Sequence, residues 1–425
     1  MKKFSFVTPR KGVVLSLIVL AAMSFISFST ATAAEDTIQI AYSGPLSGPA
    51  AVLGEQHITQ LQHMIDKIHA KGGVLGGKKF EIVPLDNKFS VQESQVNIQK
   101  MVGRNIRFIV AGPGSNISHG ISDAIKKHNS RNPGQSILFL NFVTQDIALT
   151  DANCNFWHFR FYENTDMKMQ ALTSYVAKRP DIKKIFLINQ DYDYGHAMQS
   201  AAKRFLKAKR PDVQLAGEVL HPVSKTKDFS PYIAKIKASG ADSVITANWG
   251  SDLFLLIKAG METGLDVNWL TTDAGIDDVV IVLGKTGKDR IYQVSSWHLN
   301  VPNPEMEAFT NNYEKKYDRT WYFLSIPIMF DMFAKALNEA GGSDPLRVAK
   351  ALEGMHYQSI VGDVYMRRDD HQLITSSSVS VYTDDVKYGL GGTKAKGTKM
   401  GFKTVMSFSA KDIELPTTCN MERPN

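Results

Sequence analysis

Apolar and polar residues alternate along the chain in a way that predicts short strands followed by amphipathic helices. The first such unit opens with the apolar stretch Ile38–Tyr42, which we interpret as a buried strand. A loop of Gly, Pro and Ser follows. The next helix carries apolar side chains at spacings near 3.6 residues: Ile58, Leu61, Ile65 and Ile68. A strand, a loop of small residues and a helix in this order place backbone amides at the carboxyl end of the strand.

The same order of strand and helix repeats through the first part of the chain. The predicted strands are Lys79–Leu85, Arg107–Ala111 and Ser136–Phe142. The predicted helices are Ser90–Gly103 and a segment that follows Asn116 and ends near Asn129. Alternation of this kind predicts a parallel sheet that is covered by helices on both faces.

A second, similar series follows Phe156–Tyr162. Its predicted strands are Lys184–Asn189, Val213–Leu220, Ser243–Ala247, Asn268–Thr271 and Ile291–Ser296. Its predicted helices are Tyr194–Ala208, Ser230–Ala238 and Ser251–Thr263. Because each series has its own strands, helices and apolar core, we expect two α/β lobes. No low-complexity linker separates them, which favours a hinge over a tether.

The last quarter of the chain breaks the alternation. Pro302–Gly342 predicts two helices with a connection at Trp321–Pro327, and Asp344–Leu352 predicts a third helix. From Val361 onward the pattern is one of strands and turns, with a loop rich in Gly and Lys at Tyr388–Gly401.

The N-terminus has the composition of a secretory leader. Four basic residues lie in the first eleven positions, an apolar run covers Val13–Phe28, and Ala31-Thr32-Ala33-Ala34 follows. This order is typical of a signal peptide that is cleaved near residue 34. The apolar run is short for a membrane anchor, and no Cys at the cleavage site supports a lipid anchor. We therefore expect residues 1–34 to be removed and the mature protein to be in the periplasm.

The charge of the chain depends largely on this leader. The sequence holds 49 basic and 42 acidic residues, and removal of the four basic leader residues leaves 45 against 42, a net charge of +3. No stripe of basic residues is interleaved with aromatic residues. We therefore expect no nucleic-acid partner.

Cys154 and Cys419 are the only cysteines. In an exported protein an even pair suggests one disulfide, which would join the C-terminal tail to the body of the chain. The alternative is two free thiols.

No spacing of Cys or His residues is typical of a metal site or of a cofactor, and we expect neither. His57, His63 and His69 recur every six residues on the first helix. This spacing spreads them around the helix, which predicts solvated side chains rather than a shared metal site.

Several stretches resemble the periplasmic substrate-binding proteins of branched-chain amino acid ABC transporters, the Leu/Ile/Val-binding type. They occur in the family's order through nearly the whole mature chain. These stretches are Gly44–Gln56, Ile68–Val83, Val110–Asn116, Asp191–Met198, Lys227–Ile245 and Gly264–Gly275. No single motif is decisive, and the ordered set carries the resemblance.

The resemblance implies an α/β fold of two Rossmann-like lobes, with a ligand cleft between them and a hinge of three crossings. By analogy the crossings fall near Phe156–Tyr162, Ser295–Asn300 and Arg367–Ser380. The expected lobes are residues 35–158 with 298–372, and residues 159–297 with 373–425. Asn153–Phe161 and Cys419 resemble a subgroup of the family whose ligands include aromatic acids and amides.

Ser115 and Asn116 are the first candidates for ligand binding. They follow a strand and Gly112-Pro113-Gly114 and precede a helix, where amides and a hydroxyl suit a carboxylate. The family's Ser at this place binds the ligand carboxylate. The alternative is a helix N-cap without a ligand.

Thr144 follows the next strand, and the family pattern has a Thr here that faces the ligand. Its alternative role is to cap its own turn. Phe142 and Gln145 flank Thr144 and depart from the small residues usual in the family, which predicts a reshaped pocket. Leu53 stands where amino-acid binders often have an aromatic residue, and this departure weakens a branched-chain assignment.

The second lobe supplies the remaining candidates. Trp249 follows the strand Ser243–Ala247 at a place where the family often has Tyr, and its ring could cover a ligand or pack in the core. Asp273 stands where the family places a carboxylate for the ligand's ammonium group, usually a Glu. An Asp-Ala-Gly turn is the alternative role for Asp273. Tyr194 is the last candidate, either in the cleft or on the surface of its helix.

We interpret the chain as an exported solute-binding protein that captures a small polar ligand and delivers it to an inner-membrane ABC permease. The expected ligand is an amino acid or related compound, or an aromatic acid or amide, and the expected state is a monomer. A ligand-sensing lobe for a receptor would use the same fold. An exported enzyme is the third hypothesis, although no G-x-S-x-G, H-E-x-x-H or phosphate-loop motif occurs in the sequence.

Overall fold

A computed structural model describes residues 37–391 and 399–424. The predicted signal peptide and the middle of the predicted loop Tyr388–Gly401 lie outside these residues. Asp36–Asn425 forms one compact unit. Strands alternate with helices from residue 37 to residue 295, which confirms the predicted α/β fold.

The first sheet has five parallel strands in the order β2-β1-β3-β4-β5. The strands are β1 (Thr37–Gly44), β2 (Lys79–Asp86), β3 (Phe108–Ala111), β4 (Leu138–Asn141) and β5 (His158–Arg160). Strands β3 and β4 are apolar throughout, apart from the last residue of β4, and they are buried. A parallel sheet that is covered on both faces requires such strands.

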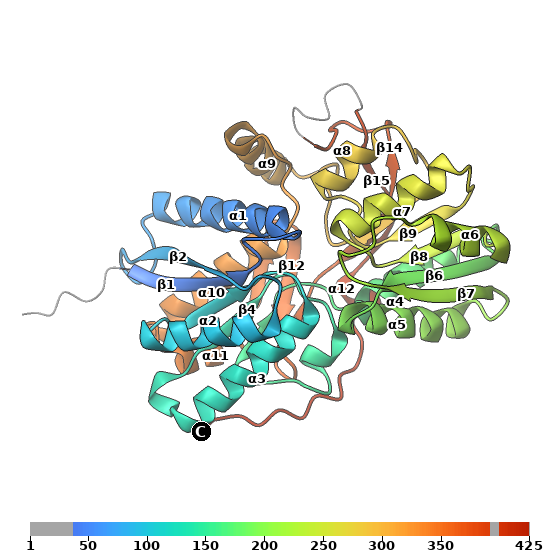
Figure 1. The fold of residues 1–425 in the computed structure, drawn as a ribbon. Coiled ribbons are helices and arrows are strands. Elements are labelled where there is room, and N and C mark those ends of the chain that lie inside the picture. Colours follow the sequence, from blue (N-terminus) through green and yellow to red (C-terminus); the bar gives the residue numbers. More distant parts are fainter. Residues whose placement is uncertain (1–36, 392–398, 425) are drawn as a thin grey trace, which may run out of the picture. The chain divides into compact units, whose positions relative to one another are not determined.

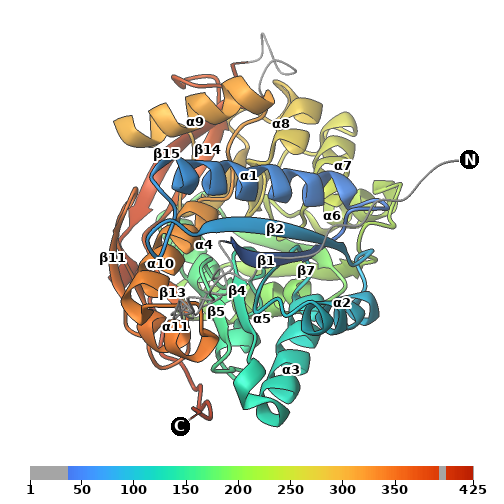
Figure 2. The same cartoon turned by 90° about the vertical axis from the view of Figure 1, so that its left-hand side faces the viewer.

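Helices lie on both faces of this sheet. α1 lies on one face, and α2 and α3 lie on the other (Figures 1 and 2). Further along the chain, α10 packs against α1, and α11 contacts β4. The helices are α1 (Ala51–Ala70), α2 (Val91–Gly103), α3 (Ser115–Arg131), α10 (Ser325–Ala340) and α11 (Pro345–Leu352), with short 3-10 turns η1 (Pro133–Gln135) and η2 (Ile147–Thr150).

The second sheet has seven strands in the order β15-β14-β10-β9-β8-β6-β7. Strands β6 to β10 are parallel, whereas β14 and β15 pair antiparallel at one edge. The strands are β6 (Lys184–Gln190), β7 (Gln214–His221), β8 (Ser243–Thr246), β9 (Asn268–Thr271), β10 (Ile291–Ser295), β14 (Ser377–Thr383) and β15 (Gly401–Phe408). The helices of this part are α4 (Thr165–Val176), α5 (Asp193–Lys209), α6 (Ser230–Ser239), α7 (Gly250–Glu262), α8 (Asp277–Leu283) and α12 (Ala410–Ile413).

The segment that holds α9 and α10 differs from the prediction at the first residue of one helix. α9 (Pro304–Tyr317) and α10 are the two expected helices, but α10 begins at Ser325 rather than after Pro327. Pro327 lies in the first turn, where the missing N–H of proline costs no helical hydrogen bond. A small antiparallel sheet of β11 (His356–Ser359), β12 (Gly362–Met366) and β13 (Leu373–Ile374) follows.

Buried polar residues join the segments that lead from one sheet to the other. The carboxylate of Glu163 accepts hydrogen bonds from Ser377 Oγ at 2.5 Å and from the amide of Ser296 at 3.2 Å. It thereby joins three segments that are far apart in the sequence. Burial raises the pKa of Glu163 although these hydrogen bonds and Lys168 lower it. The three predicted crossings meet at this residue, while the predicted lobe boundaries stay a prediction.

A disulfide joins Cys154 to Cys419, with 5.7 Å between their Cα atoms, and confirms the predicted pair. It closes a loop with a sequence separation of 265 residues. A closed loop of this length restricts the unfolded chain and stabilises the fold by about 5 kcal/mol. Within the described residues, no helix combines the length and the apolar character that a membrane span requires.

Candidate functional site

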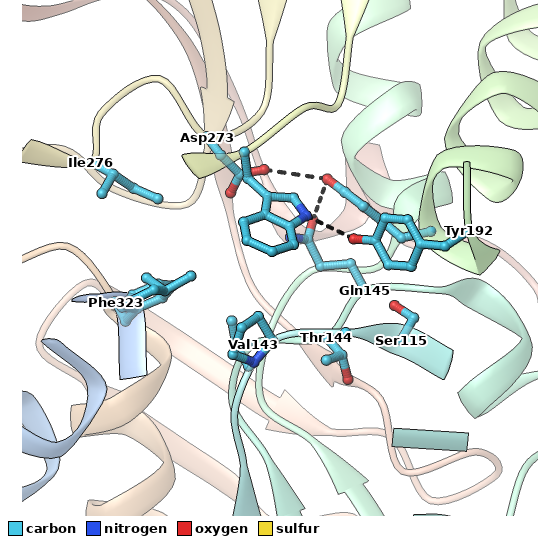
Figure 3. Close-up of a pocket in the computed structure, with 13 residues that line it drawn as sticks. Ser115, Val143, Thr144, Gln145, Tyr192, Asp273, Ile276 and Phe323 are labelled. Atoms are coloured by element: carbon cyan, nitrogen blue, oxygen red, sulfur yellow. Dashed lines mark hydrogen bonds between the residues drawn. The ribbon is translucent and has the colours of Figure 1, made fainter. Parts of the chain in front are cut away.

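A pocket lies where loops at the carboxyl ends of several parallel strands meet. The loops follow β3, β4, β6, β8 and β9, so both sheets contribute to it. Its lining residues are Leu53, Pro113, Gly114, Ser115, Val143, Thr144, Gln145, Tyr192, Tyr194, Trp249, Asp273, Ile276 and Phe323 (Figure 3). The pocket is partly open, and the space within it for the centres of water-sized molecules is about 30 Å³. A ligand larger than a few waters therefore requires the lining side chains to move.

Ser115 and the turn before it form one side of this pocket, which we call the first wall together with Thr144 and Gln145. Gly114 has a φ of 109°, a left-handed conformation that favours glycine, and it leads directly into α3. The first amides of α3 have no acceptor within the helix. Ser115 Oγ accepts a hydrogen bond from the amide of Asp146 at 3.3 Å, which leaves its hydroxyl proton for another partner. This geometry suits a carboxylate.

Thr144 and Gln145 line the first wall in different ways. Thr144 Oγ1 donates a hydrogen bond to Ser118 Oγ at 2.9 Å, so its proton is already used. Gln145 Oε1 accepts a hydrogen bond from Tyr194 OH at 3.3 Å, across the pocket. Thr144 therefore supports the wall, whereas Gln145 connects it to the opposite side.

Two predicted site residues lie outside the lining. Asn116 is half-buried on α3 and does not line the pocket. Phe142 is fully buried and packs edge-on against the rings of His57 and Phe323, with centroid distances of 5.0 and 6.2 Å. Phe142 thus lies behind Phe323, which itself lines the pocket.

His57 corrects the prediction that the histidines of α1 are solvated. Its side chain is fully buried, and its Nδ1 lies 3.1 Å from Tyr42 OH. Burial lowers the pKa of His57 to about 3, so the ring is neutral. The prediction was wrong because the ring fills space between Phe142 and Phe323, which are distant in sequence. His63 and His69 are half-buried.

Tyr194, Trp249, Asp273 and Tyr192 form the opposite side of the pocket, which we call the second wall. Tyr194 OH lies 3.0 Å from Thr272 Oγ1 and 3.4 Å from Asp273 Oδ2. Trp249 Nε1 donates to Tyr192 OH at 2.8 Å (Figure 3). These contacts fix the aromatic rings and the carboxylate relative to one another.

Asp273 is the charged residue of the lining, and it is 4% exposed. Three hydroxyl groups contact its carboxylate: Thr272 Oγ1 at 2.6 Å, Tyr194 OH at 3.4 Å and Tyr322 OH at 3.4 Å. The pocket therefore presents a buried carboxylate, contacted by hydroxyl groups, opposite the amides of α3.

Lys168 is a buried cation near this carboxylate. Burial lowers the pKa of Lys168, but Tyr162, Asp273 and Glu163 raise it by more, so the ammonium group stays charged. Its Nζ lies 4.5 Å from the centre of the Tyr162 ring. Lys168 does not line the pocket, so it balances part of the charge of Asp273 from behind the second wall.

Tyr192, Phe323, Val143 and Ile276 are lining residues that the sequence analysis missed. Burial raises the pKa of Tyr192, and the charges of Asp273, Asp193 and Asp146 add to this rise. Tyr192 follows the end of β6 by two residues, and that position could have identified it. Phe323 lies in the connection between α9 and α10, where no strand end marks it.

Comparison with known proteins relates most of the chain to a single family. A family model described as "Periplasmic binding protein" matches residues 37–385. The chain is 28% identical over 420 residues to "Leu/Ile/Val-binding protein homolog 4" of Brucella abortus, with coverage of 95% of this chain and 97% of the relative.

Solved structures agree with this match. A leucine-, isoleucine-, valine-, threonine-, and alanine-binding protein from Brucella ovis, in its closed conformation, superimposes with a TM-score of 0.81 and 26% identity over 91% of this chain and 100% of that chain. A solute binding protein from Rhodopseudomonas palustris in complex with 3,4-dihydroxy benzoic acid has a TM-score of 0.77 at 16% identity over 88% of this chain and 98% of that chain, which shows a shared fold.

Proposed function

The chain belongs to the periplasmic binding protein family, and from this premise we propose that it captures a small amino acid for an ABC transporter. The amino acid would lie between the two walls of the pocket and would be released to an inner-membrane permease. The relatives support this role, because the one from Brucella ovis is a leucine-, isoleucine-, valine-, threonine-, and alanine-binding protein. Export to the periplasm through a cleaved leader is part of the same proposal.

The observation that carries the proposal is the pairing of opposite charges across the pocket. Ser115 and the first amides of α3 suit a carboxylate on the first wall. Asp273 suits an ammonium group on the second wall. An α-amino acid carries both groups a few atoms apart, so it satisfies both walls at once.

The small cavity and Leu53 add a size preference. The space for the centres of water-sized molecules is about 30 Å³, and the rings of Tyr194, Trp249 and Phe323 line it. A short side chain therefore fits with less rearrangement than a long one. We expect alanine, threonine and valine to bind more tightly than leucine or phenylalanine.

An aromatic acid is the second candidate ligand, and Lys168 favours it. This buried ammonium already lies within the field of Asp273, so the carboxylate does not depend on a ligand for a cation. Aromatic rings on the second wall could then stack on a benzoate ring. The Rhodopseudomonas palustris neighbour was solved with such a compound.

Matched ligands separate the two candidates in a thermal-shift and calorimetric screen. Valine, isovalerate and isobutylamine share an aliphatic skeleton and carry both charges, the carboxylate alone and the ammonium alone. Benzoate and 4-hydroxybenzoate represent the second candidate. At 100 times Kd a ligand stabilises the native state by about 2.7 kcal/mol, a visible shift in Tm.

We expect valine to shift Tm and each single-charge analogue to bind at least about tenfold more weakly. Stabilisation by benzoates together with no response to amino acids would replace the first candidate with the second. Recovery of the ligand unchanged after incubation is expected of a binding protein, and a product in that assay would contradict the proposal.

A further inference from the structure

A histidine and two aspartates gather at the edge of the ligand pocket. His119 lies on α3, Asp146 follows β4, and Asp193 opens α5. One ligand atom from each lies within 4.8 Å of the other two. His119 Nε2 lies 2.7 Å from Asp146 Oδ2. No spacing along the chain marks this cluster, because its three members come from separate elements.

We propose that His119, Asp146 and Asp193 bind a divalent cation of the zinc or manganese type. One imidazole nitrogen with two carboxylates is a donor set that these ions accept, and three protein ligands leave a coordination position for water. Calcium and magnesium prefer an all-oxygen set, so the imidazole discriminates against them. The inference concerns regulation of the ligand pocket and rests on the proposed function.

The cluster holds two carboxylates and one imidazole, so its charges favour a bound cation. Asp146 is buried and already contacts His119. Asp193 is exposed, and across residues 37–391 and 399–424 no hydrogen bond or ion pair is recorded for its carboxylate. Two carboxylates this close repel each other. A divalent ion between them removes that repulsion and would displace the proton or the hydrogen bond that His119 now shares with Asp146.

The cluster connects the two walls of the pocket. Asp146 follows Gln145, and His119 lies one helical turn after Ser115, so both belong to the first wall's elements. Asp193 lies between Tyr192 and Tyr194, which both line the second wall. A cation held by all three residues would join the walls beside the ligand and favour their approach. The cation and the ligand should then bind cooperatively.

Metal binding can be measured without any organic ligand. The protein, purified without a polyhistidine tag and stripped with EDTA, is titrated with ZnCl₂ and with MnCl₂ by isothermal calorimetry. We expect one site per chain in the wild type. His119→Gln and Asp193→Asn should each weaken binding at least about tenfold, because each removes one of three ligands.

The chain offers a matched control in the pair of Asp191 and His196. His196 Nε2 lies 2.8 Å from Asp191 Oδ1 at the same helix terminus, and in the described part of the chain no third ligand joins this exposed pair. His196→Gln should leave metal binding unchanged. Binding that survives Asp193→Asn, or that is lost equally in His196→Gln, would overturn the proposal, as would a wild-type protein that binds neither ion.

Small-angle X-ray scattering tests the connection between the walls. We expect Zn²⁺ alone to reduce the radius of gyration of the wild-type protein and to leave that of Asp193→Asn unchanged. An equal response in both proteins would overturn the bridging role. The ligand screen is independent of these titrations, so a failed metal site and a failed transport proposal give different results.

Discussion

The two walls of the pocket differ in what holds them and in what they offer a ligand. The first wall offers backbone amides and a serine hydroxyl at the start of α3, with Thr144 turned to Ser118. The second wall offers a carboxylate and aromatic rings that are fixed by hydroxyl contacts, such as Trp249 Nε1 to Tyr192 OH. Under the proposed function, the backbone groups of the first wall bind the ligand's carboxylate. The side chains of the second wall bind its ammonium group and line the space for the rest of the ligand.

This difference teaches where specificity can change. A substitution on the first wall removes one donor while the neighbouring amides remain, so its effect should be small. A substitution on the second wall removes a group that nothing replaces. We therefore expect the second wall to determine which ligand is bound. We expect the first wall to select ligands that carry a carboxylate.

Removal of the charge at Asp273 should have the largest effect. Asp273→Asn leaves the ligand's ammonium group without its ionised partner in a buried pocket, at a cost of about 2 to 3 kcal/mol, or about 30- to 150-fold in Kd. Calorimetry with the amino acid from the screen measures this loss. Asp266→Asn is a matched control, because Asp266 pairs with Arg290 on the surface with 76% of its side chain exposed. An Asp273→Asn protein with wild-type affinity would remove the ammonium assignment.

Low pH should lower the free energy of unfolding through His57, which packs behind the first wall. His57 is buried and neutral with a pKa of about 3, whereas an unfolded histidine titrates near 6.5. Below pH 6.5, His57 therefore binds a proton in the unfolded chain but not in the folded chain. His57 alone should reduce the free energy of unfolding by about 1.4 kcal/mol per pH unit, or about 2 kcal/mol between pH 6.5 and 5.

Denaturant unfolding at both pH values measures this slope. His57→Gln should remove the contribution of His57 to the dependence of the free energy of unfolding on pH, although it lowers stability at pH 7. His196→Gln, at an exposed position, should leave the slope unchanged. A slope that is the same in wild type and His57→Gln would show that the ring is not held neutral behind Phe142.

Removal of the Ser115 hydroxyl should have the smallest measurable effect. Ser115→Ala deletes one hydrogen bond to the ligand carboxylate and leaves the amides of α3, which predicts a loss of about 1 kcal/mol, or about fivefold in Kd. Thr144→Val should change Kd by less than about twofold, because that hydroxyl donates to Ser118. A larger loss in Thr144→Val than in Ser115→Ala would reverse the roles given to these residues.

Local patterns were enough to predict most of the fold. Apolar runs such as Phe108–Ala111 and the periodic helix α1 identify elements whose buried faces are set by their own sequence. Helix α4 and helix α8 were missed. Buried polar residues such as Thr165, Lys168 and Thr173 obscure the apolar face of α4.

The candidate site was predicted mainly at strand ends, although Leu53 and Tyr194, which lie within helices, were also named and also line the pocket. Ser115, Thr144, Trp249 and Asp273 stand at strand ends, and all four line the pocket. His57 on α1 is buried against Phe323, which lies in a segment more than 250 residues from α1. No local pattern indicates such a contact. The disulfide was predictable because only one pairing of two cysteines exists.

A crystal structure with the most stabilising ligand of the screen tests the account most directly. We predict that the ligand carboxylate lies within hydrogen-bond distance of Ser115 Oγ and the first amides of α3, and that its nitrogen faces Asp273. A ligand carboxylate on the second wall, or a ligand bound outside the pocket, would contradict the division of recognition between the two walls.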